Sequence, residues 1–154
     1  MKISINIQPD HPDTEISITC PVLTPEVEKL ISMVRVLDSK LTVKKDSEVF
    51  LLGLDEILYL EAMERKCFVY TKSEVYESDA KMYELEQQLA ASGFFRVSKS
   101  NLLNLKHIQS LRTDINHRIR ITMTNGEQLI ASRMYADELR ERLGLKKGGT
   151  YGET

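Results

Sequence analysis

The sequence predicts an α+β protein that is predominantly β, with short antiparallel sheets and flanking helices. Many short runs alternate apolar and polar residues between turn residues, as strands with one buried face require. Three longer stretches, at residues 24–37, 78–92 and 132–143, repeat apolar residues at helical spacing instead. With 154 residues, 42% of them hydrophobic, the chain can bury one core of ordinary domain size.

Residues 1–41 are predicted to form a β-hairpin followed by a helix. Isoleucines alternate with polar residues over 3–7, a second alternating run spans 16–20, and two prolines break the chain between them. Thr24 followed by Pro25 marks a helix start. A hairpin and one helix are too small to hold a core alone. We therefore expect this element to dock on the rest of the chain, on a second copy of itself in dimerisation, or on a regulatory protein. The apolar stripe of its helix is Val27, Leu30, Ile31, Val34 and Leu37.

Residues 42–145 are predicted to form the main, mostly β domain. A turn at Asp46-Ser47 and a charged segment at 63–66 each separate two expected strands. Asn125-Gly126, between two alternating runs, favours a type I′ hairpin because both residues tolerate positive φ. The expected strands lie at residues 41–43, 49–51, 57–62, 67–71, 75–77, 94–97, 108–111, 118–123 and 128–130.

Two further helices are expected in this domain. Ser78 and Asp79 are predicted to begin the first of them, and Gly93 to end it. Ser132 is predicted to cap the second, which ends at Gly144. Residues 146–154 are rich in glycine and are expected to form a flexible tail.

Composition and motifs exclude several classes of function. No apolar run is long enough to cross a bilayer and no signal peptide is evident, so we expect a cytoplasmic protein without membrane insertion. Cys20 and Cys67 lack CxxC spacing and the histidines lack ligand spacing, so no disulfide, metal or other cofactor is expected. No catalytic motif is present, and a surface turn would not activate Lys99 for catalysis, so the protein is not expected to be an enzyme.

The net charge of −2 hides a marked asymmetry along the chain. Residues 46–93 contain 4 Lys or Arg against 11 Asp or Glu, whereas residues 94–147 contain 11 against 5. The C-terminal part could therefore face a polyanion. Alternatively, the opposite charges pair across one compact domain, and charge alone favours neither interpretation.

Three polar elements with cations stand beside expected strand ends, at residues 63–66, 98–104 and 132–133. If the sheets bring these loops to one edge, they could enter successive grooves of duplex DNA, with lysines on phosphates and arginines or asparagines on base edges. The alternative for 98–101 is an ordinary solvated turn in which Ser98 or Ser100 caps a short helix. The candidate DNA-binding residues are Arg65, Lys66, Ser98, Lys99, Ser100, Asn101, Asn104, Lys106 and Arg133.

Several segments carry a family resemblance. Residues 55–62 read DEILYLEA, residues 94–100 read FFRVSKS, residues 102–108 read LLNLKHI, and residues 131–135 read ASRMY. Together with Asn125-Gly126-Glu127 and a closing helix, these segments keep an order and spacing over residues 46–145 that resembles the LytTR family. The members of this family are DNA-binding domains of bacterial transcription regulators.

The resemblance implies short antiparallel sheets whose loops contact bases in successive major grooves, usually as two copies on direct repeats. Family contacts fall on the loop after the glutamate-alanine pair, here Arg65 and Lys66, on the turn at 98–100, and on the arginine after the serine, here Arg133. The family often has histidine-arginine-serine in that turn, whereas this chain has Ser-Lys-Ser. Lys99 lacks the planar fork of arginine, so we expect it to contact phosphate.

The chain departs from the commoner architecture of the family. Residues 1–40 are too short for a receiver domain and lack its acidic pocket, so control by aspartyl phosphorylation is not expected. The N-terminal element looks like that of small stand-alone regulators of this family. The expected function is a sequence-specific regulator on double-stranded promoter DNA, acting as a homodimer or with an inhibitory or signalling protein partner. The alternative is a β-rich protein-interaction adaptor whose cationic face is incidental.

Overall fold

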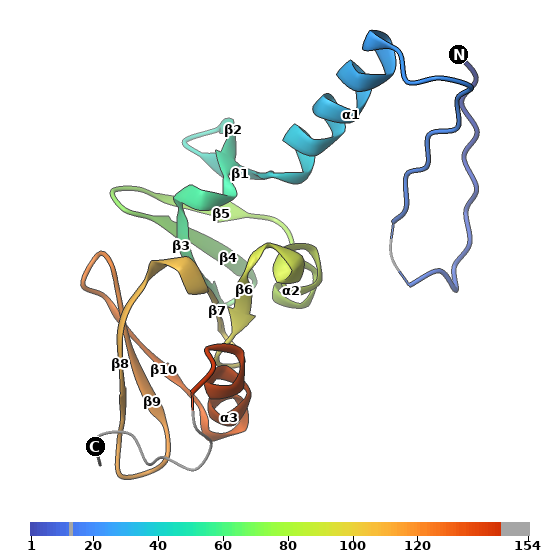
Figure 1. Cartoon of the computed structure of the whole chain (residues 1–154). Helices are drawn as coiled ribbons and strands as arrows, with labels where there is room; N and C mark the ends of the chain where they lie inside the picture. Colours follow the sequence, from blue (N-terminus) through green and yellow to red (C-terminus); the bar gives the residue numbers. More distant parts are fainter. Residues whose placement is uncertain (13, 146–154) are drawn as a thin grey trace. The chain divides into compact units, whose positions relative to one another are not determined.

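The computed structural model describes residues 1–12 and 14–145, and this part of the chain contains three α-helices and ten strands (Figure 1). Contacts divide the chain into two units, Met1–Val34 and a second unit that begins at Arg35. The predicted tail at 146–154 lies outside the described residues.

The first unit differs from the predicted hairpin. Residues 1–12 and 14–24 contain no strand, so the two alternating runs are not paired as a ladder. Ile3, Ile5 and Ile7 are 81%, 84% and 85% exposed. An isolated two-stranded hairpin is marginal in water unless another layer buries one of its faces. The sequence therefore alternates as a strand would, but no described residue of this unit covers the isoleucine side chains.

The helix predicted after Thr24 is confirmed as α1 (Pro25–Asp38). The backbone N–H of Val27 donates to the Thr24 hydroxyl at 3.3 Å, which is the expected N-cap contact. The stripe residues Val27, Leu30 and Ile31 are only half-buried. The side chain of Leu37, also assigned to this stripe, lies outside the described residues.

The second unit is built on an antiparallel sheet of seven strands in the order β2-β1-β5-β4-β3-β7-β6 (Figure 1). Asp46 and Ser47 join β1 to β2 with φ values of 50° and 66°, as the predicted turn requires. Lys40 and Leu41 already pair with β2, so the sheet begins before residue 42. The strands are β1 (Lys40–Lys45), β2 (Glu48–Gly53), β3 (Ile57–Met63), β4 (Lys66–Thr71), β5 (Val75–Ser78), β6 (Phe94–Arg96) and β7 (Asn101–Asn104).

A second antiparallel sheet has three strands in the order β10-β9-β8. Its strands are β8 (Ile108–Thr113), β9 (Ile119–Met123) and β10 (Gln128–Ala131). The α-helices of the second unit are α2 (Met82–Leu89), between β5 and β6, and α3 (Arg133–Arg142), after β10. Short 3₁₀ turns occupy Leu54–Glu56, Ala90–Ser92 and Leu105–His107.

The central strands of the seven-stranded sheet are buried on both faces, whereas Val49 and Leu51 of β2 and Val75 of β5 are 60%, 59% and 44% exposed. One face packs on α2 through a cluster that includes Leu85 and Leu102. The other face packs on the three-stranded sheet and α3 through a cluster that includes Leu103, Ile121 and Leu139. Leu102 and Leu103 enter different clusters because successive side chains of a strand point to opposite faces. The central strands therefore read as continuous apolar runs in the sequence.

The predicted start of α2 is wrong by several residues. Ser78 is the last residue of β5 rather than a helix cap, and its hydroxyl accepts from the backbone N–H of Ala80 at 3.1 Å. The helix begins at Met82, where the Glu84 carboxylate accepts from the N–H of Lys81 at 3.0 Å. The end was predicted correctly, since Gly93 has φ of 86° after the 3₁₀ turn that follows α2.

The β9–β10 hairpin is confirmed, but its turn is not type I′. Gly126 has φ of 88°, whereas Asn125 is not among the residues with positive φ. The N–H of Gly126 donates to the carbonyl of Met123 at 2.9 Å, and the N–H of Met123 donates to Glu127 at 2.8 Å. This is a type I turn that ends in a left-handed glycine, the usual three-residue alternative.

None of the helices in the described residues is long and apolar enough to span a membrane. Nor do three or more His, Cys, Asp or Glu side chains within this part of the chain gather closely enough to hold a metal ion.

Candidate functional site

The polar turn (residues 98–101) connects β6 to β7 and is held by its own side chains. The Ser98 hydroxyl accepts from the backbone N–H of Ser100 at 3.3 Å and from that of Asn101 at 3.1 Å. The same hydroxyl donates to the Asn101 side-chain oxygen at 3.2 Å, and Ser100 donates to that oxygen at 3.4 Å. Strand β7 starts at Asn101, so these serines order a strand-to-strand turn and do not cap a helix.

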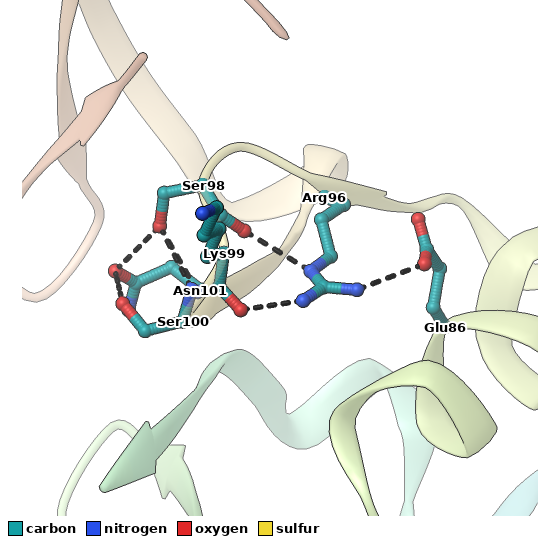
Figure 2. A network of polar contacts seen from close by, with 6 residues as sticks. All are labelled: Glu86, Arg96, Ser98, Lys99, Ser100 and Asn101. Carbon is teal, nitrogen blue, oxygen red and sulfur yellow. Dashed lines mark hydrogen bonds and ion pairs between the residues drawn. The ribbon is translucent and has the colours of Figure 1, made fainter. Parts of the chain in front are cut away.

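Arg96 fixes the same turn from outside. Its Nε donates to the carbonyl of Ser98 at 3.0 Å and its Nη2 to the carbonyl of Lys99, while Nη1 contacts Glu86 of α2 at 3.1 Å (Figure 2). The Arg96 side chain is 18% exposed, so these bonds form with little competition from water. The guanidinium thus ties α2 to two consecutive carbonyls of the turn. This arrangement leaves the Lys99 side chain exposed on an ordered backbone.

Two backbone hydrogen bonds bring the three sequence-predicted loops together. The N–H of Ala62, near the end of β3, donates to the carbonyl of Ser100 at 2.8 Å. The N–H of Ser132, just before α3, donates to the carbonyl of Val97 at 2.9 Å. The polar turn therefore sits between the end of β3 and the start of α3.

The cations flanking the polar turn are on the surface. Arg65 is exposed in the tight turn between β3 and β4, three residues beyond Ala62. Lys66 is the first residue of β4, exposed, with its Nζ 3.6 Å from Glu77. Arg133 is the first residue of α3 and is also exposed. We name this set, together with Lys99, the cationic edge (Arg65, Lys66, Lys99 and Arg133).

Asn104 is not part of this edge, because the structure places its side chain in the interior. It is 1% exposed, and its amide nitrogen donates to the carbonyls of Ile57 at 3.0 Å and Leu54 at 3.4 Å. Its side-chain oxygen accepts from the N–H of Lys106 at 3.1 Å. With both amide atoms occupied by backbone groups, Asn104 joins the start of β3 to the end of β7.

Lys106 is exposed but lies at the other end of β7 from the polar turn. Its Nζ is 2.7 Å from the Asp55 carboxylate, just before β3. The hydrogen bond and the charge of Lys106 lower the pKa of Asp55 below its ordinary value. Lys106 is therefore separated from the cationic edge by the length of the strand and has a carboxylate partner.

The sequence reasoning missed Arg96 and its partner Glu86. Arg96 alternates with the buried residues Phe95 and Val97, which predicts that it faces away from the core. An arginine two residues before a turn of small polar residues is also well placed to donate to the carbonyls of that turn. The sequence contains both signals, but nothing in it identifies Glu86 on α2 as the second anchor.

Arg96→Gln tests whether this side chain orders the polar turn. We expect amide hydrogen exchange of Ser100 and Asn101 to accelerate by about tenfold, since removing charged hydrogen bonds worth roughly 1.5 kcal/mol makes local opening easier. Exchange in the β8–β9 pair should stay as in the native protein. Unchanged exchange at Ser100 would show that the serine contacts alone hold the turn.

Comparisons with known proteins find similar sequences and a similar fold. The family described as "LytTr DNA-binding domain" matches residues 47–144. Uncharacterized HTH-type transcriptional regulators of Staphylococcus aureus strains NCTC 8325 and COL are each 26% identical over 147 residues, which covers 94% of this chain and 99% of theirs. A solved LytTr DNA-binding domain of a Bacillus cereus protein superposes with a TM-score of 0.66 at 27% identity, covering 70% of this chain and 98% of that one.

Proposed function

The chain belongs to the LytTR family of DNA-binding domains, and from that premise we propose that it regulates transcription by reading a specific duplex sequence through the cationic edge. The family is one of DNA-binding transcription regulators rather than enzymes. We further propose that two copies bind together on a direct repeat. Such a regulator would act in the cytoplasm, where bacterial promoters are.

The observation that carries this proposal is the convergence of three loops that are far apart in the sequence. A hydrogen bond of 2.8 Å holds the polar turn to the end of β3, and one of 2.9 Å holds Val97, just before the turn, to Ser132 at the start of α3. Four exposed cations therefore stand in loops or at the first residue of the element that follows one, supported by the sheet, which is how binding residues are commonly presented. A surface of this kind suits the evenly spaced phosphates of a duplex.

The cations differ in what they can recognise. Arg65 and Arg133 carry planar forks that can bind the two acceptors of guanine in the major groove. Lys66 and Lys99 are point charges suited to phosphate oxygens. The hydroxyls of Ser98 and Ser100 and the side-chain oxygen of Asn101 already bond within the polar turn, so we assign these residues to keeping Lys99 in place. Asn104 is left out of the interface because it is buried.

Loops rather than a helix pair would make these contacts. The Staphylococcus relatives are named as HTH-type, but strands separate all three α-helices in the described part of this chain. No two of them form a helix-turn-helix. Among the residues of α3, only the first, Arg133, belongs to the cationic edge.

The N-terminal unit supplies the argument for assembly. Its isoleucines at 3, 5 and 7 are more than four-fifths exposed, and exposed apolar groups in alternation suit burial against another chain. We propose that this unit pairs two copies. Alternatively, a signalling or inhibitory protein binds these isoleucines in place of a second copy. The same exposed isoleucines would support a role as a protein-interaction adaptor that does not bind DNA.

The test begins by selecting duplexes from a random pool with the full chain and ends by titrating the enriched sequence. Affinity should fall with salt at a log–log slope of about −0.9 for each phosphate neutralised, so two phosphate-bound lysines per copy predict about −3.6 for two copies. Sedimentation should show two chains on a duplex with the repeat. Affinity should be lower for a duplex with a single half-site, because only one of the two paired copies can contact its bases there.

A matched duplex with the same composition but shuffled sequence provides the control, and it should bind with the same salt slope and lower affinity. No enrichment, together with no binding at low salt, would contradict the proposal and favour the adaptor. One chain on the full repeat would contradict the binding of two copies but not the sequence-specific binding.

A further inference from the structure

The outer face of the three-stranded sheet carries two arginines that stand opposite each other. Arg112 of β8 and Arg120 of β9 are direct register partners. The residues on either side of Arg120, Ile119 and Ile121, are 2% and 0% exposed, so they face the core and Arg120 points away from it. We name the two residues the arginine pair (Arg112 and Arg120).

This pair has no counter-charge in the described part of the chain. Opposed positions in an antiparallel sheet place Cβ atoms about 4.5–5.5 Å apart, and like charges there are destabilising. Neither guanidinium forms an ion pair or hydrogen bond with a described residue. Arg118 on the neighbouring loop differs, because its Nη2 lies 3.3 Å from the Asp114 carboxylate.

The pair lines a shallow hollow of about 150 Å³ together with Ser110, Thr122 and Gln128. Thr122 is the register partner of both Ser110 and Gln128, so these three form one row across the sheet, beside the arginines. The row supplies two hydroxyls and an amide, all able to donate hydrogen bonds. No carboxylate is among the residues that line the hollow.

We propose that the arginine pair binds one phosphate group in this hollow. A guanidinium presents a planar fork that matches two oxygens of a phosphate, and two forks can share its oxygens. A phosphate monoester carries about −1.5 to −2 charges near pH 7, close to what two arginines balance. The hydroxyls of Ser110 and Thr122 and the Gln128 amide can donate to the remaining oxygen.

The phosphate can come from a phosphodiester of bound DNA, which carries one negative charge and two free oxygens, or from a free phosphorylated small molecule, whose monoester carries the larger charge. The position of the pair is compatible with DNA, because Ile130, the register partner of Arg120, lies only three residues before Arg133. The arginine pair would then be a phosphate contact beyond the cationic edge. A free ligand would make the same contacts without DNA.

The first arm of the test uses the full chain, inorganic phosphate and no DNA. NMR should show saturable shifts of the Arg112 and Arg120 side-chain N–H signals when phosphate replaces chloride at constant ionic strength. Arg112→Gln or Arg120→Gln should abolish the saturable shift at the remaining arginine. Lys72→Gln removes one exposed positive charge in the β4–β5 turn and should leave the shifts as in the native protein.

The second arm measures the salt slope of duplex binding for the same variants. If the site holds a DNA phosphate, each arginine variant loses one phosphate contact per copy, so the magnitude of the salt slope for two bound copies should fall by about 1.8 relative to Lys72→Gln. If the slope is unchanged while the phosphate shifts saturate, the ligand is a free phosphate-bearing molecule.

The inference is overturned if inorganic phosphate causes no saturable shift and the salt slopes of the variants equal that of the Lys72→Gln control. Thermal unfolding without phosphate checks the fold, and both variants should unfold at or above the native midpoint because charge repulsion is relieved. The phosphate arm needs no DNA, so failure of the proposed regulator function would leave it intact.

Discussion

Arg133→Ala should lower affinity for the selected duplex by about 5- to 150-fold per bound copy, the range that corresponds to losing one bidentate base contact. Affinity for the shuffled duplex should change little, because that affinity rests on phosphate contacts. Lys99→Ala should weaken binding to both duplexes by a similar factor and reduce the magnitude of the salt slope for two bound copies by about 1.8, because each copy loses one phosphate contact. Fluorescence anisotropy with both duplexes measures all four affinities.

The matched control for both changes is Lys72→Ala, an exposed lysine at the other end of β4 from Lys66. It should leave both affinities near those of the native protein. Equal losses on the two duplexes for Arg133→Ala and Lys99→Ala would contradict the division between a base-reading arginine and a phosphate-binding lysine.

Asn104→Asp should lower the free energy of unfolding by about 3 kcal/mol or more. The substitution keeps the shape of the side chain but replaces an amide that donates to the carbonyls of Leu54 and Ile57 with a carboxylate that repels them. The site is 1% exposed, so water cannot compensate. Urea unfolding followed by circular dichroism measures the change.

Asn125→Asp is the matched control, because Asn125 is exposed and its side-chain oxygen accepts from the N–H of Glu127, a role that aspartate keeps. Its effect should be within about 0.5 kcal/mol. If Asn104→Asp were equally mild and instead weakened DNA binding, Asn104 would be a ligand contact rather than a buried brace.

Local signals in the sequence determined much of the fold. Thr24-Pro25 set the start of α1, Gly93 ended the helical stretch before β6, and Asn125-Gly126 closed the β9–β10 hairpin. Each of these signals acts through backbone conformation or capping within a few residues, so no knowledge of the tertiary structure is needed. The ordered set of motifs over residues 46–145 also identified the family correctly.

Other outcomes depended on which residues are neighbours in space. The alternation over 3–7 predicted a paired strand, but a strand needs a covering layer, and no sequence pattern shows whether one is present. Ser78 carried a cap signal, yet pairing of Cys67 with Ser78 extended β5 through it and delayed α2 to Met82. Tertiary pairing thus overrode the local preference.

The candidate site divides in the same way. The sequence by itself proposed the four cations of the cationic edge as DNA contacts, because their segments follow strand ends and match the motifs of the family. Their contact with DNA stays a prediction. Only the tertiary structure showed that the Asn104 side chain is buried and that Lys106 lies at the other end of β7 from the polar turn. Only the structure revealed that Arg96 and Glu86 brace the polar turn. The physical reason is that burial and long-range hydrogen bonds join residues distant in the chain, while capping and turn preferences act between neighbours.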